Sequence, residues 1–96
     1  MKLSAAILKG MERFPKKAVG QNFSADEKGA CALGCALWAI GGDDALFSCA
    51  ARAKARNETY EAELRFQREY SIGVSQANDH GIPREDIAGM LMAIGE

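Results

Sequence analysis

The first quarter of this 96-residue chain repeats apolar residues at the spacing of an amphipathic helix. Its apolar stripe contains Leu3, Ile7, Leu8 and Met11. The pattern predicts a first helix over 3–13, because Pro15 forces the residue before it out of the helical region.

The longest apolar run extends from Ala30 to Gly42 and contains no charged residue. It is too short to span a bilayer but has a suitable length for a helix buried in a protein core. We therefore expect a central helix over 30–40, closed by Gly41 and Gly42 in left-handed conformations. The rest of the chain would pack around this helix.

Two interpretations remain open for the polar segment that precedes this run. The Ser24-x-x-Glu27 capping box could start the central helix at Ala25. Alternatively, residues 18–30 form a short hairpin-like loop, and the helix starts at about Ala30. We favour the second interpretation, because Gly29 would cost a helix interior about 1 kcal/mol.

Three further helices are predicted in the second half of the chain. Asp43 or Asp44 would cap a helix that runs to Arg56, with the apolar residues Leu46, Cys49, Ala50 and Ala53 facing inward. Asn57 or Thr59 would cap the next helix, which runs to about Asn78 on an inner stripe of Ala62, Phe66, Tyr70, Val74 and Ala77. Pro83 would open the last helix, whose inner stripe is Ile87, Met90, Leu91 and Ile94.

These elements predict one domain over 1–96 with an all-α fold. The expected architecture is a compact bundle of about five helices around the buried central helix, with the aromatic side chains of Trp38 and Phe47 in the core.

The balance of charged residues limits which classes of partner the chain is expected to bind. The chain has 12 basic and 13 acidic residues, so a protein whose main role is to bind phosphates is not expected. Four basic residues near the N-terminus are either a small basic patch or, as we favour, solvated helix ends: Lys9, Arg13, Lys16 and Lys17. The first apolar segment ends at Lys9, before it reaches the length of a signal-peptide core. We therefore expect a cytoplasmic protein without membrane contact.

The three cysteines raise the question of metal binding. Cys31 and Cys35 are four residues apart on a helix, and Cys49 with His80 could complete a zinc set. Small apolar side chains in a core explain the cysteines better, and reduced thiols fit a reducing compartment. No metal and no cofactor is expected.

Cys31 is the best candidate for catalysis because it lies near the predicted start of the central helix, where a thiol becomes more acidic. The only histidine, His80, could act as its base, and Asn78 or Asp79 could orient that histidine. The constellation is that of a cysteine hydrolase, but no sequence motif surrounds Cys31. We lean against an enzyme.

Residues 77–90 allow a nucleic-acid interpretation. The spacing of Ala77, Gly81, Ile87 and Met90 resembles that of a helix-turn-helix. The second helix would open with Pro83-Arg84-Glu85-Asp86, however, and its two carboxylates would repel phosphates. Nucleic acid is therefore an alternative partner that we do not favour.

The polar cluster Asn78-Asp79-His80 is a second candidate binding site. It can serve as a helix end followed by a turn, which is the interpretation we favour, or as the rim of a pocket near the central helix.

The Cys31-Ala32-Leu33-Gly34 segment, followed by Asn78-Asp79 and a short terminal helix, resembles a group of small uncharacterised bacterial and phage-borne helical proteins. Ala77 stands where that group has tryptophan, and residues 80–83 replace its turn. The resemblance implies only a shared helical architecture, and it favours an arrangement in which Cys31 lies near Asn78 and Asp79. It implies no activity.

These observations predict a non-catalytic protein-interaction module, acting on a protein partner or as a homodimer. One positive sign is Met92, which lies off the inner stripe of the last helix. An exposed methionine there would suit a partner surface.

Overall fold

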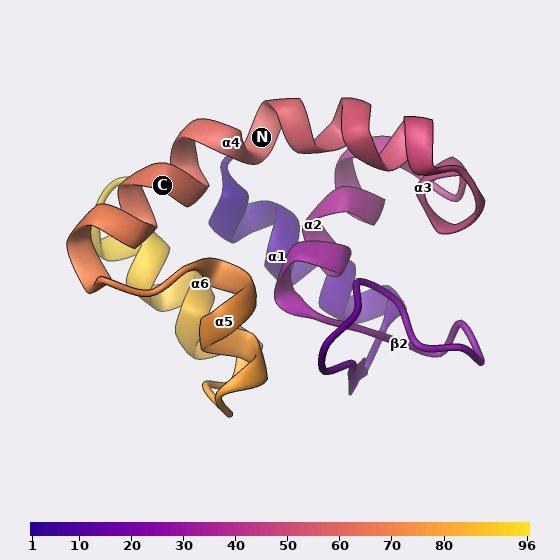
Figure 1. Ribbon diagram of the computed structural model, residues 1–96, viewed down its shortest axis with the longest axis horizontal. Coiled ribbons are helices and arrows are strands. Elements are labelled where there is room, and N and C mark those ends of the chain that lie inside the picture. The colour runs from indigo at the N-terminus through magenta and orange to yellow at the C-terminus, as the bar shows by residue number, and fades with distance from the viewer.

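The structure is a computed structural model that describes all 96 residues, and it is predominantly helical (Figure 1). Six helices and two short strands follow one another as α1 (Leu3–Arg13), β1 (Lys16–Lys17), β2 (Gly29–Ala30), α2 (Ala32–Gly41), α3 (Asp44–Phe47), α4 (Cys49–Tyr70), α5 (Val74–Asp79) and α6 (Arg84–Ala93). The helical class is confirmed, with one helix more than expected and a two-stranded parallel sheet. None of the helices combines the length and the apolar character needed to cross a bilayer.

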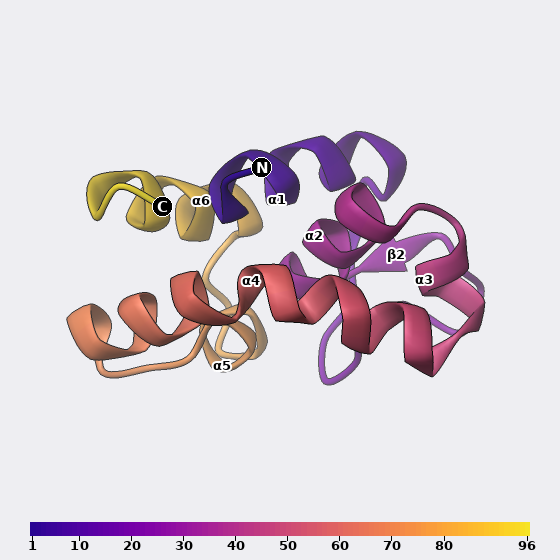
Figure 2. The same ribbon diagram turned by 90° about the horizontal axis from the view of Figure 1, so that it is seen from above.

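Helix α2 lies in the middle of the molecule, with α1 on one side and α4 on the other (Figure 2). Its Leu33, Cys35 and Leu37 side chains are fully buried, as the apolar run predicts. Helices α1 and α2 cross closely at Gly10, where an added Cβ would lie 2.2 Å from the carbonyl oxygen of Cys35. Only glycine allows this approach.

The loop before α2 follows the second of the two interpretations. Cys31 is the N-cap of α2, and residues 22–31 double back through an antiparallel bridge between Phe23 and Ala30. The Ser24 hydroxyl accepts a hydrogen bond from the Gly29 N–H at 2.8 Å, so it closes this turn and does not cap a helix. Strands β1 and β2 then pair in parallel.

The predicted boundary between the third and fourth helices is wrong. The chain leaves the helical conformation at Ser48, whose side-chain oxygen caps α4 by accepting from the Ala51 N–H at 3.1 Å. Helix α4 then continues through Asn57 and Thr59 without a break. The Thr59 hydroxyl donates to the carbonyl oxygen of Arg56 at 3.0 Å, so it is satisfied inside the helix.

This shift of boundary changes which face of α4 is buried. The inward side chains are Ala55, Thr59, Ala62 and Phe66. Three residues that were expected to face inward are exposed instead: Cys49, Ala50 and Ala53. Phe47, also expected in the core, is 71% exposed at the end of α3.

The predicted helix to Asn78 is two helices. Ser71 adopts a left-handed conformation with φ 59°, which ends α4, and α5 begins after Gly73. The predicted apolar positions of both helices are nevertheless buried or half-buried, because Val74 and Ala77 pack with Phe66 in the main core. Helix α6 starts after Pro83 and buries Ile87 and Leu91 as expected.

Candidate functional site

A small pocket brings together two residues that the sequence singled out. It has a volume of about 130 Å³ and is lined by Gly20, Gln21, Asn22, Cys31, Ser75 and Asp79. Cys31 comes from the start of α2 and Asp79 from the end of α5, which are 48 residues apart in the chain. His80 does not line the pocket.

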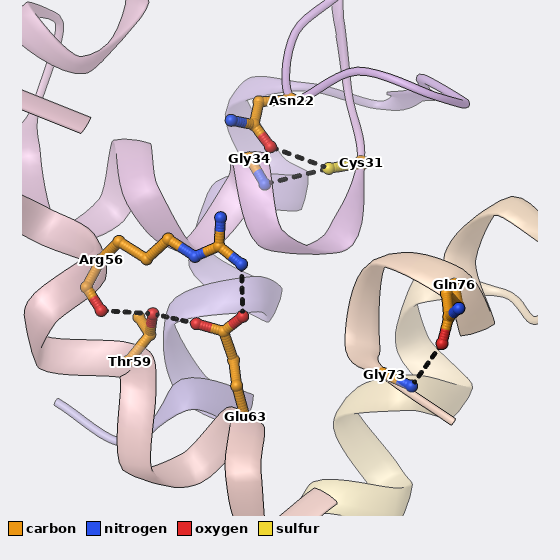
Figure 3. A network of polar contacts seen from close by, with 8 residues as sticks. All are labelled: Asn22, Cys31, Gly34, Arg56, Thr59, Glu63, Gly73 and Gln76. Carbon is orange, nitrogen blue, oxygen red and sulfur yellow. Dashed lines mark hydrogen bonds and ion pairs between the residues drawn. The ribbon is translucent and has the colours of Figure 1, made fainter. Parts of the chain in front are cut away.

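The Cys31 thiol is enclosed and hydrogen-bonded (Figure 3). Its Sγ accepts from the Gly34 N–H at 3.2 Å and lies 3.7 Å from Oδ1 of Asn22, to which the thiol donates. The side chain is only 3% exposed. Burial raises the pKa of the Cys31 thiol, while the amides of Gly34 and Leu33 oppose this rise. The thiol is therefore protonated at neutral pH.

Asn78 is fully buried and joins three parts of the chain. Its Oδ1 accepts from the Ala32 N–H at 3.0 Å, which is an otherwise unpaired amide in the first turn of α2. Its Nδ2 donates to the carbonyl oxygen of Ala18 at 2.9 Å. The side chain thus fixes α5 to the start of α2 and to the loop after β1.

Asp79 is exposed, yet its carboxylate is occupied. Oδ1 accepts from the Gly20 N–H at 2.9 Å and from Nδ2 of Asn78 at 3.1 Å. The Gly20 amide, followed by the Asn78 amide, holds the pKa of this carboxyl below its usual value. Asp79 is therefore an ionised anchor for the Gly20 turn.

The remaining residues of the catalytic and metal hypotheses lie apart from this pocket. His80 is exposed at the C-cap of α5, and no hydrogen bond links it to Cys31. Cys35 is buried next to Arg84, where burial raises the pKa of its thiol to about 11. Cys49 is exposed at the start of α4. No three side chains of the metal-ligating types come together.

Sequence reasoning missed the most unusual polar residue, Arg84. Its guanidinium is buried and donates to the carbonyl oxygens of Phe14 at 2.7 Å, Pro15 at 2.8 Å and Ala30 at 3.0 Å. It forms no salt bridge with any carboxylate. Its position could have indicated that it is buried, because Arg84 lies three residues before Ile87 and therefore on the inner stripe of α6.

The position of Arg84 also bears on the helix-turn-helix interpretation. It is the only basic residue of α6, and it faces the interior. The exposed residues of that helix are Glu85, Asp86, Gly89, Met92 and Ala93. The exposed face of α6 thus carries two carboxylates and no cation.

No family model, no curated protein and no solved structure matches this chain. Its function has to be inferred from its own surface and interior. Around the Cys31 pocket, Asn78 and Asp79 hold the loop and the helix ends together. The exposed surface of α4, in contrast, contains side chains without an intramolecular role.

Proposed function

We propose that the chain is a non-catalytic interaction module that pairs with a second copy of itself through the outer face of α4. The observation that carries the proposal is an uncharged stripe on this helix, on the side opposite its buried face. We call this the outer stripe and define it as Ala50, Ala53, Asn57, Tyr60 and Leu64.

The outer stripe has the spacing of a helix-pairing seam. Its members follow one another at intervals of three, four, three and four residues, which is the heptad pattern of paired helices. At about 100° per residue they lie roughly 180° from the buried stripe of α4. Four of the five are exposed, Tyr60 by 57%, and Leu64 is half-buried.

The place of the outer stripe in the molecule and the charged residues around it support a role in binding a second copy. Helix α4 runs along the upper edge of the molecule in Figure 1, and most of its outer stripe is exposed. Most other exposed positions of α4 are charged: Lys54, Arg56, Glu58, Glu61, Arg65, Arg68 and Glu69. An uncharged stripe between charged flanks is the usual layout of a helix that docks against another helix.

Side-chain size favours an antiparallel arrangement of two copies. The N-terminal half of the stripe has the small residues Ala50 and Ala53, and the C-terminal half has the larger Tyr60 and Leu64. Antiparallel pairing sets the small residues of each copy against the large residues of the other, which fills space evenly. Parallel pairing would set alanine against alanine and leave a gap.

Charge favours the same arrangement. Residues 49–57 contain three basic and no acidic residues, whereas residues 58–70 contain four acidic and two basic residues. Antiparallel pairing places these unlike halves together, and parallel pairing places like halves together. It also brings Lys54 close to the second copy's Glu61, because the two residues lie on the same flank of the stripe. A two-fold symmetric pair satisfies both contacts at once.

Helix α6 supports the proposal less strongly. Met92 is 53% exposed, so the expectation that it lies off the inner stripe is confirmed. Its exposed neighbours are Gly89 and Ala93, which add little apolar area. The outer stripe of α4 is the larger continuous surface.

Sedimentation of two matched variants tests the proposal. Ala53→Glu places a charge in the outer stripe, and Ala5→Glu places the same charge on an exposed position of α1. We expect the native chain and Ala5→Glu to approach twice the monomer mass of 10.3 kDa at several hundred micromolar. Ala53→Glu should stay at the monomer mass. A native chain that remains monomeric throughout, or an Ala53→Glu chain that still pairs, contradicts the proposal.

A further inference from the structure

A second pocket, away from Cys31, is surrounded by positive charge. It has a volume of about 270 Å³ and is lined by Arg13, Pro15, Lys16 and Lys28. Arg13 ends α1, and Lys16 belongs to β1. The parallel register pairs Lys16 with Gly29, which brings Lys28 beside Lys16 although twelve residues separate them.

None of these three cations is neutralised by an ion pair. The two salt bridges of the molecule lie elsewhere, between Arg56 and Glu63 and between Arg65 and Glu96. The Arg13 guanidinium instead lies over the ring of Phe14, 4.6 Å from its centroid. This contact restrains Arg13 at the pocket while its charge stays available.

Arg84 adds a fourth positive charge behind the wall of the pocket. Its buried guanidinium forms no salt bridge with a carboxylate and instead donates to the carbonyl oxygens of Phe14, Pro15 and Lys16. The negative ends of these peptide dipoles therefore point into the protein. The carbonyl oxygens of residues 14–16 therefore face Arg84 and not the pocket, so they do not weaken the positive potential of Arg13 and Lys16.

One carboxylate, that of Asp26, opposes the cluster. It accepts from the Ser24 hydroxyl and from the Lys28 N–H, and the charges of Lys16 and Lys28 help to keep its pKa below the usual value. The residues that line the pocket nevertheless carry three positive charges and no negative charge.

We propose that this pocket binds the phosphate group of a small phosphorylated molecule. A phosphate monoester carries up to two negative charges and three strong acceptor oxygens, which suits several converging cations. A small ligand fits better than a nucleic acid, because these three cations converge on one pocket while residues 29–96 carry ten acidic and six basic residues. The site is independent of the outer stripe of α4.

Binding can be measured from backbone amide NMR shifts during titration with inorganic phosphate and with pyrophosphate. We expect saturable shifts confined to residues 13–17 and 26–30, with pyrophosphate binding more tightly than phosphate. The triple variant Arg13→Gln/Lys16→Gln/Lys28→Gln should bind pyrophosphate at least about tenfold more weakly, because it loses charge-assisted hydrogen bonds. These side chains are exposed, so the variant should fold.

A charge-matched control separates the pocket from general electrostatics. Lys2→Gln/Lys9→Gln/Arg68→Gln also removes one arginine and two lysines, all exposed and none of them lining the pocket. It should retain native affinity. Asp26→Asn removes the opposing charge and should raise affinity about threefold.

Three results would overturn the proposal. One is the absence of saturable shifts with either anion. Another is an equal loss of affinity in the two triple variants. The third concerns the source of the phosphate: a single-stranded oligonucleotide that binds more tightly per phosphate than pyrophosphate, with shifts spread beyond the pocket, would assign the surface to nucleic acid. An oligonucleotide response that is weaker and confined to the same residues supports the pocket.

Discussion

The polar interior around Cys31 and Arg84 and the outer stripe of α4 differ in how their side chains are used. No buried side-chain nitrogen or oxygen lacks a hydrogen-bond partner. Asn78 and Arg84 between them bind backbone groups in two stretches of the chain, residues 14–18 and residues 30–32. The outer stripe contacts solvent. The conspicuous polar residues of this chain therefore hold the fold together. The unremarkable alanines of α4 remain available to a partner.

The largest effect should follow from removing Arg84. Arg84→Ala leaves several buried carbonyl oxygens without a donor, and we expect the free energy of unfolding to fall by at least about 3 kcal/mol. Urea denaturation at low protein concentration measures this loss. Arg84→Met, which keeps most of the side-chain volume, should be almost as destabilising. If the methionine variant were as stable as the native chain, the carbonyl contacts would not be what Arg84 contributes.

Asn78 should come next. Asn78→Ala leaves the Ala32 amide and the Ala18 carbonyl unpaired, which we expect to cost about 2 kcal/mol. Asn78→Asp retains an acceptor for Ala32 but cannot donate to Ala18 when it is ionised. Thermal unfolding of the two variants tests whether both contacts matter. Equal stability of Asn78→Ala and the native chain would show that α5 is held by packing alone.

Substitutions in the outer stripe should weaken self-association while leaving the stability of the monomer almost unchanged. Tyr60→Ala removes an exposed side chain, so we expect the stability of the monomer to change by no more than about 0.5 kcal/mol. Self-association should nevertheless weaken clearly, because aromatic side chains carry much of the energy of such contacts. A loss of stability without a loss of association would place Tyr60 in the fold and not in the interface.

The smallest effect concerns acid. The pKa of the Asp79 carboxyl is lowered in the folded chain. Asp79 therefore contributes its full stabilisation at any pH above the usual pKa of an aspartate. That contribution is lost as the pH falls through the lowered pKa, below about pH 4. Asp79→Asn should therefore flatten part of the acid dependence of the unfolding free energy. An acid limb identical to that of the native chain would mean that the Gly20 contact is not coupled to folding.

The parts of the fold that the sequence predicted are those where local signals and tertiary packing agree. Helix α1 was placed correctly because Pro15 ends an unambiguous apolar stripe. Gly29 rightly argued against an early start of α2. In both places a single residue with a strong backbone preference decides the outcome.

The errors come from residues with two possible roles. Asn57 and Thr59 can cap a helix, but a cap forms only if the chain leaves the helix there, and the Thr59 hydroxyl is satisfied by Arg56 within α4. Arg84 reads as a surface residue because its partners, the carbonyls of Phe14 and Ala30, are distant in the chain. The exposed position of Ala50 and Ala53 follows from the same misplaced boundary.

Disulfide cross-linking tests the pairing of α4 most directly. In a Cys49→Ser background, Asn57→Cys places a thiol at the middle of the outer stripe, whereas native Cys49 marks its N-terminal end. In an antiparallel pair the two copies of residue 57 lie close together, and the two copies of Cys49 lie about 24 Å apart. We predict rapid cross-linking through residue 57 and none through Cys49. Cross-linking through Cys49 and not through residue 57, or through neither, would contradict the antiparallel pair.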